Sequence, residues 1–281
     1  MKIEDIILCP ACKSKLNIAE QNYICSNCST SYKIISNIPV LLSEETQKNI
    51  QSLEKYFNNK YAESKDPWGY ESSAAEKMKY DFVINLIRKI NPDLKSILDV
   101  GCSFGYLSNK LSLISENVTG LDVSIHALTN AKEKYHRDNL NFICASAANI
   151  PLKDNAFEIV TLCDGLNGMD LTGAARDNAV KESYRVLKRN GYALFTDYLK
   201  PSQFEDYINY INKSEYKIKE VIYLNDRFWY KLKYAGHSFR NNSFFKKILS
   251  SISIGKALSI ISSLFGKRGS NHICVVAQKS E

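Results

Sequence analysis

The residues best suited to chemistry near the start of the chain are four cysteines in two identically spaced pairs. Each pair has the Cys-x-x-Cys pattern, and the four are Cys9, Cys12, Cys25 and Cys28. Two such pairs can bring four thiolates together in a tetrahedron around one Zn²⁺. A filled set of four sulfur ligands leaves no open position for water or substrate. We therefore expect a structural zinc that supplies folding energy to a segment too short for a large core.

A second stretch with chemical potential, LDVGCSFG from Leu98 to Gly105, joins an apolar run to two glycines. The apolar run is typical of a buried parallel strand, and the glycines indicate a tight turn before a helix that begins at Tyr106. At Gly101 the missing side chain allows a ligand to approach the backbone closely. A helix behind such a turn also suits a dinucleotide phosphate, but that fingerprint needs a third glycine where this chain has Ser108.

The cysteine-containing segment resembles a known family. CPACKSKL, YICSNCSTSYKI and NIPVLL, all within residues 7–42, are similar to the short zinc ribbons that occur alone or fused to methyltransferases, one of them a ribosomal RNA guanine methyltransferase. The resemblance implies a domain of residues 1–43 that acts as an accessory module and recognises a substrate or a partner.

The remainder, residues 44–281, resembles the class I S-adenosylmethionine-dependent methyltransferases. The first match is the Asp-x-Gly-x-x-x-Gly pattern, and three more follow in the family's order: VTGLDVS (118–124), NFICASAANIPLKDNAFEIVTLCDGL (141–166) and SYRVLKRNGYALFTDYL (183–199). The last match is expected to be a helix, a turn at Leu-Lys-x-x-Gly and the fifth strand. The resemblance implies an α/β, Rossmann-like fold with a seven-stranded sheet. A nucleotide-binding domain of the same architecture and another function is the alternative.

The same resemblance implies S-adenosyl-L-methionine as the cofactor. Gly101 and Gly105 would line its methionine moiety, and Asp99 would hold both the turn and the amino group. Asp122, at the tip of the second strand, can accept both ribose hydroxyls through its two oxygens. The expected cofactor site as a whole consists of Tyr70, Asp99, Gly101, Cys102, Gly105, Asp122, Val123, Ser146, Ala147 and Asp164.

Two positions depart from the family's pattern. Ser103 replaces the middle glycine of the turn, and Ser146 replaces the acid that usually binds the adenine amino group. A serine hydroxyl accepts that hydrogen bond without the assistance of a charge, and backbone amides near Ala147 are expected to provide the rest. We therefore predict a weaker affinity for the free cofactor than the family's pattern would give.

The acceptor is expected beside the residues that follow the fourth strand, 163–168. Methyl transfer from a sulfonium is an in-line displacement, so the protein mainly aligns the acceptor and, for a hydroxyl or ammonium, removes a proton. Asp164 is the only ionisable side chain there and is the candidate catalytic residue, as a base or as a group that orients the acceptor. Holding the cofactor or capping the next element is an equal alternative. The Asn/Asp-Pro-Pro-Tyr signature of enzymes that methylate base amines is absent.

The class of acceptor is suggested by a further short resemblance. DPWGYESSAAEKMKY (66–80) together with GCSFG is similar to the nodulation-type methyltransferases, which N-methylate a sugar oligomer. This implies that residues 68–80 cover the cofactor, with Tyr70 near its carboxylate or sulfonium, where a ring face attracts a cation. A core position for Tyr70 is the alternative. The resemblance also implies a small-molecule or glycan-type acceptor, methylated on nitrogen or oxygen.

Composition places the chain among ordinary globular proteins. Its 281 residues, 44% hydrophobic and 24% charged, suffice for one large domain and one small one. No apolar run reaches the roughly 18 residues of a membrane-spanning helix. The N-terminal stretch lacks the apolar core of a signal peptide, so we expect a cytoplasmic protein. In a reducing compartment, Cys102, Cys144, Cys163 and Cys274 are expected to be small core residues.

Positive charge gathers toward the C-terminal end. Residues 226–281 contain ten Lys and Arg against two acids, a net +8, which leaves −1 for the first 225 residues of a chain with net charge +7. Such asymmetry suits an anionic partner, whether nucleic acid, phospholipid or a phosphorylated substrate; a solvated lysine-rich face is the alternative. The segment of residues 226–270 is also much longer than a hairpin loop needs to be. We expect an insertion of amphipathic helices that forms a lid, lies on an anionic membrane through 243–268, or packs on the core.

Three further elements are expected to position these residues. A helix capped by Ser72 or Ser73, with Glu76 in its first turn, should precede the first strand and end at Asn91-Pro92. After the fifth strand, the sequence predicts a helix over 201–213, a strand over 216–225 and a final strand over 271–280. The last two should form an antiparallel hairpin that carries the insertion.

Three functions follow from these patterns. The leading hypothesis is a cytoplasmic methyltransferase for a small-molecule or glycan-type acceptor. The second is a methyltransferase for ribosomal or transfer RNA, favoured by the ribbon and the basic C-terminal region and opposed by the nearly neutral first 225 residues. The third is a methyltransferase-like binding partner without activity, which Ser103 and Ser146 permit.

Overall fold

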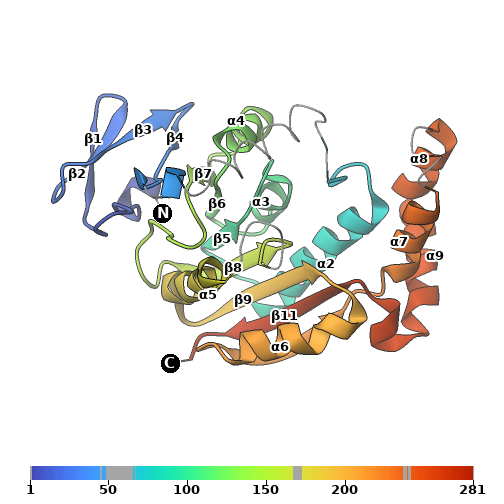
Figure 1. Cartoon of the computed structure of the whole chain (residues 1–281). Helices are drawn as coiled ribbons and strands as arrows, with labels where there is room; N and C mark the ends of the chain where they lie inside the picture. Colours follow the sequence, from blue (N-terminus) through green and yellow to red (C-terminus); the bar gives the residue numbers. More distant parts are fainter. Residues whose placement is uncertain are drawn as a thin grey trace.

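Two sheets of very different size organise the molecule (Figure 1). The computed structural model describes residues 2–44, 46–48, 66, 68–166, 173–236, 239 and 242–280. A small sheet near the N-terminus lies at one end, a large sheet with helices on both faces forms the body, and three helices from the basic C-terminal region lie at the opposite end.

The large sheet has seven strands in the order β10-β11-β9-β8-β5-β6-β7. The strands are β5 (Ile97–Val100), β6 (Val118–Asp122), β7 (Leu140–Cys144), β8 (Phe157–Cys163), β9 (Leu187–Tyr198), β10 (Lys217–Tyr223) and β11 (His272–Gln278). Strands β5 to β9 are parallel to their neighbours, and β11 is antiparallel to both β9 and β10. The predicted α/β sheet and its final antiparallel hairpin are confirmed. The carboxyl ends of β5 to β10 and the start of β11 therefore share one edge.

Five helices cover the two faces of the large sheet. One face carries α2 (Ala74–Ile90), α3 (Tyr106–Leu111) and α4 (Ile125–Lys134), and the other carries α5 (Ala174–Val186) and α6 (Phe204–Asn212), which follows the short η2 (Pro201–Gln203). Side chains alternate between the two cores along each strand: Ile97 packs toward α2 and Leu98 toward α5. All four residues of β5 are buried because a parallel strand between two helical layers has no solvent-facing side.

Helix α2 begins and ends where the sequence predicts. The Ser73 hydroxyl accepts a hydrogen bond from the Glu76 amide at 3.3 Å, and the helix ends before Asn91. The structure has a strand where the sequence predicted a turn at 187–191. Strand β9 already begins at Leu187 and pairs with β8, with a shift in register near its start. A Cβ at Gly191 would lie 2.8 Å from the Glu158 carbonyl oxygen, so only glycine allows the strand to pass this close.

The small sheet is attached directly to the large one. Its strands are β1 (Leu16–Ala19), β2 (Asn22–Cys25), β3 (Ser31–Ile35) and β4 (Ile38–Pro39), after the short η1 (Ile3–Asp5). Backbone amides of Leu8 and Leu41 donate to the carbonyl oxygens of Pro151 and Cys144, each at 2.8 Å. Buried side chains of the two parts form one continuous core on the α5 face.

The basic region folds as helices packed on the end of α2. It contains α7 (Arg227–Ala235), α8 (Ser243–Ser250), α9 (Ile252–Ser263) and η4 (Gly266–Gly269), between β10 and β11. A Cβ on Gly255 of α9 would lie 2.9 Å from the Met78 sulfur of α2, so the two helices touch. Among the described residues, no helix is both long and apolar enough to cross a membrane.

The two glycines of the first turn have different local roles, and this difference gives a stability prediction. Both have positive φ, but a Cβ at Gly105 would lie 2.9 Å from the Phe142 ring and 3.0 Å from the Ala131 Cβ, whereas one at Gly101 would meet nothing within 4 Å. Gly105→Ala should therefore lower the free energy of unfolding by about 2–3 kcal/mol, combining backbone strain with overpacking. Gly101→Ala should cost about 1 kcal/mol from strain alone. Urea denaturation followed by circular dichroism would measure both, and equal costs would contradict this assignment.

Candidate functional site

The glycine turn lies over the ends of β5 and β6. The Gly101 amide donates to the Leu121 carbonyl at 2.8 Å, and the Ser103 amide donates to Asp122 Oδ2 at 2.9 Å. These bonds fix the turn while leaving the Cβ side of Gly101 open. The space beside Gly105 is instead filled by neighbouring side chains, so the local role of this glycine is to let α3 pack closely. A lining role for Gly105 toward the methionine moiety stays a prediction.

Ser103 occupies a backbone conformation that favours glycine. Its φ is +49°, in the left-handed region where a Cβ costs about 1–2 kcal/mol. This explains in physical terms why glycine suits this position. The hydrogen bond from the Ser103 amide to the Asp122 carboxylate, together with the burial of Ser103, holds the turn in place despite the strain.

The two acids of the expected cofactor site have distinct partners. Asp99 is buried and accepts hydrogen bonds from the hydroxyls of Ser108, at 2.6 Å, and Thr161, at 2.8 Å. Burial raises the pKa of Asp99 to about 6 although these bonds favour the charged form. The carboxylate thus ties α3 and β8 to the end of β5, and its contact with the amino group of the cofactor stays a prediction.

Asp122, at the end of β6, is only half-buried. Its Oδ1 accepts from the Ser124 amide and its Oδ2 from the Ser103 amide, both at 2.9 Å. Burial raises its pKa, while the backbone amides act in the opposite direction. The backbone amides thus position the carboxylate, which is partly exposed and can still accept a hydrogen bond from a ligand.

Four other expected cofactor residues lie around this edge. The Ser146 hydroxyl accepts from the Ala148 amide at 3.2 Å, and the half-buried Ala147 lies between them. Val123 is partly buried in the core beneath α2 to α4, and its carbonyl accepts from the Cys144 thiol. Cys102 is buried and its sulfur lies against Gly120, so only its backbone can serve a ligand.

Tyr70 joins an aromatic cluster next to the start of α3. Its ring centroid lies 5.7 Å from that of Tyr80 and 6.5 Å from that of Tyr106. Tyr80 is buried on α2, whereas Tyr70 and Tyr106 are partly exposed. The ring of Tyr70 is thus packed against other aromatic side chains, and its contact with the cofactor stays a prediction.

Asp164 is the centre of a series of ion pairs whose members are buried or partly buried. It lies at the end of β8 in a left-handed conformation with φ +58°, forms an ion pair with Lys79 of α2, and has Oδ1 3.3 Å from Nε2 of His272. Lys79 Nζ also lies 2.6 Å from Glu76 Oε2, and His272 Nδ1 contacts Asp226. Lys79 and His272 are only 3% and 2% exposed. Of the expected acceptor segment, residues 167 and 168 lie outside the described part of the chain.

The charged side chains next to Asp164 determine its protonation state. Burial alone would raise its pKa, but Lys79 and His272 outweigh burial and hold the pKa of Asp164 well below its usual range. Burial likewise lowers the pKa of His272, but Asp164 and Asp226 outweigh it and raise that pKa to about 9. At neutral pH the carboxylate is therefore charged and a weak base, better suited to accept a hydrogen bond than a proton.

Sequence reasoning missed the partners of Asp164. Glu76 and Lys79 belong to an amphipathic helix, where charged residues usually face solvent, and His272 begins a strand of apolar residues. One signal was present. Glu76, Lys79 and Val83 have the spacing of a single helical face, so two charges stand in line with residues that enter the core.

A pocket of about 370 Å³ adjoins this charge chain between α2, β10, α7 and α9. Lys79 and Asp226 belong to both the pocket and the charge chain. Most of the remaining wall is apolar and includes Met78, Phe82, Ile222, Leu224 and Trp229. The pocket can therefore take an apolar group, while the buried Lys79 and the partly buried Asp226 lie at its wall.

Aromatic rings surround His272 at the same edge of the sheet. The rings of Tyr198, at the end of β9, and Tyr230, on α7, lie 5.2 and 5.5 Å from the imidazole. The Tyr230 hydroxyl donates to Glu76 Oε1 at 2.7 Å, which links α7 to α2. The insertion thus contributes directly to the surroundings of Asp164.

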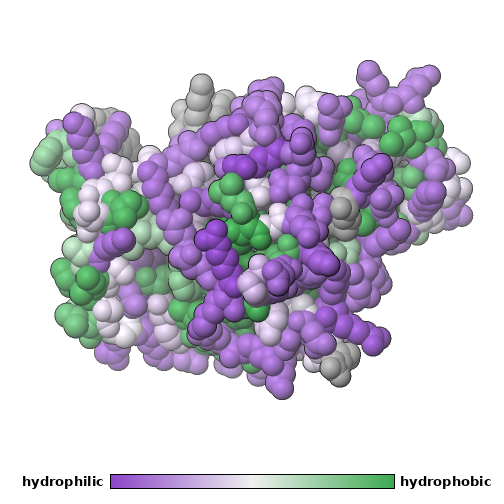
Figure 2. All heavy atoms as spheres, turned by 180° about the vertical axis from the view of Figure 1, so that it is seen from behind, coloured by the Kyte–Doolittle hydropathy of each residue, from purple (hydrophilic) through white to green (hydrophobic). Residues whose placement is uncertain are grey.

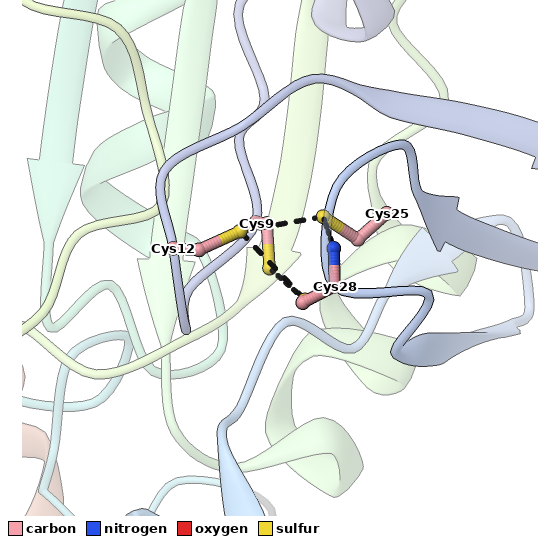
Figure 3. A group of neighbouring side chains, drawn as sticks. All are labelled: Cys9, Cys12, Cys25 and Cys28. Carbon is pink, nitrogen blue, oxygen red and sulfur yellow. Dashed lines mark hydrogen bonds between the residues drawn. The ribbon is translucent and has the colours of Figure 1, made fainter.

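The four cysteines converge from two loops (Figure 3). Their sulfur atoms all lie within 4.8 Å of one another, with Cys9 and Cys12 each 3.7 Å from Cys28 and Cys12 3.4 Å from Cys25. Four sulfurs about 2.3 Å from a tetrahedral metal would be roughly 3.8 Å apart. The donor set and its spacing therefore fit one four-coordinate metal ion.

The loop of the first cysteine pair contacts the segment that carries Ser146. The Asn149 side-chain amide donates to the Pro10 carbonyl at 3.0 Å, and Lys13 Nζ donates to the Ile150 carbonyl at 3.0 Å and to Asn149 Oδ1 at 2.5 Å. The loop of Cys9 to Lys13 thus contacts the segment that carries Ser146.

The raised pKa of His272 gives a prediction for stability against pH. A folded-state pKa of about 9 above the reference value of 6.5 stabilises the protein fully below pH 6.5, and the contribution disappears as pH rises through 9. Between these values the free energy of unfolding should fall by up to about 3 kcal/mol, since one pKa unit corresponds to about 1.4 kcal/mol. His272→Gln should flatten this dependence in urea titrations. The exposed His136→Gln variant is the control, and an unchanged slope in His272→Gln would contradict the assignment.

Comparisons with known proteins agree with this geometry. Residues 98–195 match the model of a family described as a methyltransferase domain. A 2-phytyl-1,4-naphtoquinone methyltransferase from Nostoc sp. is 31% identical over 147 residues, covering 49% of this chain and 60% of the relative. The ubiquinone/menaquinone biosynthesis C-methyltransferase UbiE of Rickettsia akari is 33% identical over 142 residues, covering 46% and 55%. The chain thus spans little more than half the length of these curated relatives.

A solved structure extends the comparison to most of the chain. The N-methyltransferase NodS from Bradyrhizobium japonicum WM9, in complex with S-adenosyl-L-homocysteine, is similar with a TM-score of 0.58 at 13% identity, covering 82% of this chain and 98% of that one. At this identity the likeness concerns the fold. Together with the strand order, it shows that this chain has the class I methyltransferase fold, with a matched methyltransferase domain over residues 98–195.

Proposed function

We propose that this protein is an S-adenosyl-L-methionine-dependent methyltransferase that acts on a small-molecule or glycan-type acceptor. The observation that carries the proposal is the turn at Gly101, where open backbone lies beside the positioned carboxylate of Asp122. The match of residues 98–195 to a methyltransferase domain and the quinone methyltransferases among the relatives support it.

The residues around the turn fit the cofactor. Asp122 would accept the ribose hydroxyls with its remaining lone pairs, and Gly101 would leave room for the methionine moiety. Ser146, whose hydroxyl already accepts one backbone amide, would be a weak partner for the adenine amino group. When bound, the cofactor supplies a methyl group on a positively charged sulfur. The exposed part of Tyr70 would contact that charge.

The acceptor would bind on the other side of Asp164, in the pocket between α2, β10, α7 and α9. A pocket of about 370 Å³ with mostly apolar walls favours a small molecule with an apolar part. Because Lys79 and His272 keep Asp164 charged, we assign it to hold a donor group of the acceptor by a hydrogen bond. A hydroxyl or ammonium donor fits this role.

A second candidate acceptor atom is carbon. The relatives at 31% and 33% identity carry the names of a naphtoquinone methyltransferase and a quinone-biosynthesis C-methyltransferase. An aromatic ring would suit the pocket wall formed by Met78, Phe82 and Trp229. Transfer of a labelled methyl group shows whether the acceptor is one of these small molecules or RNA. It also shows whether this protein is an active enzyme or only binds ligands.

The direct test supplies the protein with methyl-labelled cofactor and a cell extract separated into RNA, protein, lipid and small-molecule fractions. We expect label in the small-molecule or lipid fraction, and analysis of the labelled product identifies the methylated atom. Label found only in the RNA fraction would show that RNA is the acceptor and would contradict the proposed small-molecule or glycan-type acceptor. No label in any fraction, together with no binding of S-adenosyl-L-homocysteine, would contradict the proposed activity.

Cofactor binding tests the turn separately from the acceptor. Gly101→Ala places a methyl group in the proposed ligand space, so we expect at least about a tenfold loss of affinity for S-adenosyl-L-homocysteine by calorimetry, which corresponds to about 1.4 kcal/mol. Gly266→Ala is the matched control, because Gly266 also has positive φ and nothing within 4 Å of its Cβ position, but it lies after α9 and not in the turn. Asp122→Asn should also lower the affinity about tenfold through loss of charge-assisted bonds. Equal affinity of the two glycine variants would refute the location of the site.

We further propose that Cys9, Cys12, Cys25 and Cys28 bind one structural Zn²⁺. Their spacing fits a tetrahedral ion, and the sulfur of Cys25 also accepts the amide of Cys28 at 3.4 Å, as a thiolate ligand can. The zinc would hold the loop of Cys9 to Lys13 in shape. Through Asn149 and Ile150 this loop would stabilise the segment that carries Ser146.

Metal removal should therefore have two measurable effects. Elemental analysis is expected to find about one zinc per chain, and Cys28→Ser or a strong chelator should lower both the melting temperature and, several-fold, the affinity for S-adenosyl-L-homocysteine. Lys13→Ala separates the effects, because it should keep zinc and lose only the contacts to Asn149 and Ile150. Normal cofactor affinity in the zinc-free protein would contradict the proposed support of the loop.

A further inference from the structure

We propose that α8 and α9 dock this protein onto the surface of an anionic phospholipid membrane. The inference goes beyond the proposed function and does not depend on it. It rests on a group of solvent-exposed apolar side chains, here called the docking face: Phe244 on α8, Ile260 and Ile261 on α9, and Leu264 and Phe265 directly after α9. Phe244 and Leu264 are 72% and 79% exposed.

The arrangement of α9 explains why this face is turned outward. Gly255 packs against α2, and the Ser262 hydroxyl accepts the Phe228 amide at 3.1 Å, so one side of α9 is fixed to the body of the protein. The residues of the docking face have the spacing of the remaining side. The rear view shows hydrophobic atoms gathered along the edge formed by α8 and α9, with hydrophilic atoms beside them (Figure 2). The fold thus presents large apolar side chains that its own core does not use.

The charge around the docking face selects an anionic partner. Residues 227–280 contain no Asp or Glu, although they contain ten Lys and Arg. Five of these are exposed on or next to the helices of the docking face: Lys246, Lys247, Lys256, Lys267 and Arg268. Lys267 is paired with Glu205, and within the described part of the chain the other four form no ion pair. Apolar side chains bordered by unopposed positive charge are the pattern of helices that lie in the interface of anionic bilayers.

The same observations argue against other occupants. A second copy would bring two basic faces together, which costs energy because neither supplies an acid. Nucleic acid would pair with the lysines and its bases can stack on Phe244 and Phe265, but Ile260, Ile261 and Leu264 would gain no apolar partner from a phosphate backbone. Helices α8 and α9 have 8 and 12 residues, too short to cross a bilayer and suited to lie along its surface.

Sedimentation with lipid vesicles tests the proposal on the full chain. The probes are vesicles of phosphatidylcholine alone and vesicles of phosphatidylcholine mixed with phosphatidylglycerol. The protein should sediment with the mixed vesicles, much less with phosphatidylcholine alone, and less at high salt.

Two variants with matched controls identify the docking face. Leu264→Ser should reduce the bound fraction about five- to tenfold, since it removes a large apolar side chain from the bilayer. Leu113→Ser, a change of a leucine that is 60% exposed at the end of α3, should leave binding unchanged. The charge reversal of Lys246 and Lys247 to Glu should abolish the preference for phosphatidylglycerol, while Lys33→Glu on the small sheet should not.

Three results would overturn the proposal. The first is a wild-type protein that stays in solution with the mixed vesicles. The second is binding that Leu264→Ser and Leu113→Ser reduce equally. The third is a concentration-dependent dimer, measured by light scattering and lost in Leu264→Ser, in a protein that binds no vesicles, because the face would then serve a second copy. Circular dichroism of each variant confirms that the fold is intact.

Discussion

The ion pair between Asp164 and Lys79 is the interaction on which the acceptor side of this molecule depends. It joins the end of the fourth parallel strand to the helix that precedes the first, and His272 extends it to the last strand in the sequence. Lys79 is buried and Asp164 is partly buried, so loss of the Asp164 carboxylate would leave the Lys79 charge inside the protein without this partner. Tyr230 adds the inserted helices through Glu76. Segments far apart in the sequence are thereby fixed around a single carboxylate.

This chain of charges divides the sheet edge into two regions with different chemistry. Around β5 to β7, backbone amides and small residues surround an open turn, and the acids there are positioned by hydroxyls and amides. Around β8 to β11, charged and aromatic side chains surround an apolar pocket. Asp164 lies between the two regions, a reasonable position for a group that aligns an acceptor with a donor. One side of helix α9 forms part of the pocket wall, and the other side carries part of the docking face. An amphiphilic acceptor in a lipid surface bound by this face would therefore lie near the pocket.

Local patterns predicted the part of this structure that local residues determine. The strand before Gly101, the cap at Ser73, the seven-stranded sheet with its final antiparallel hairpin and the convergence of the four cysteines all follow from spacing within a few residues, or from a known succession of elements. The partners of Asp164 could not be obtained in this way, because Lys79 and His272 reach it only after α2 and β11 have packed. The same holds for Gly105, whose role depends on the distant Phe142. Contacts between remote segments are set by tertiary packing, which the sequence pattern of either segment does not contain.

The attachment of the small sheet also protects the large one. β7 is an edge strand of the seven-stranded sheet, and Val40, just after β4, pairs with Cys144 at its end in parallel orientation. Unpaired edges of this kind offer backbone donors and acceptors to any other extended chain and so promote aggregation. By occupying the end of β7, the segment after β4 removes part of that opportunity. The cysteine-bearing module therefore leaves less of this edge open to pairing with another extended chain.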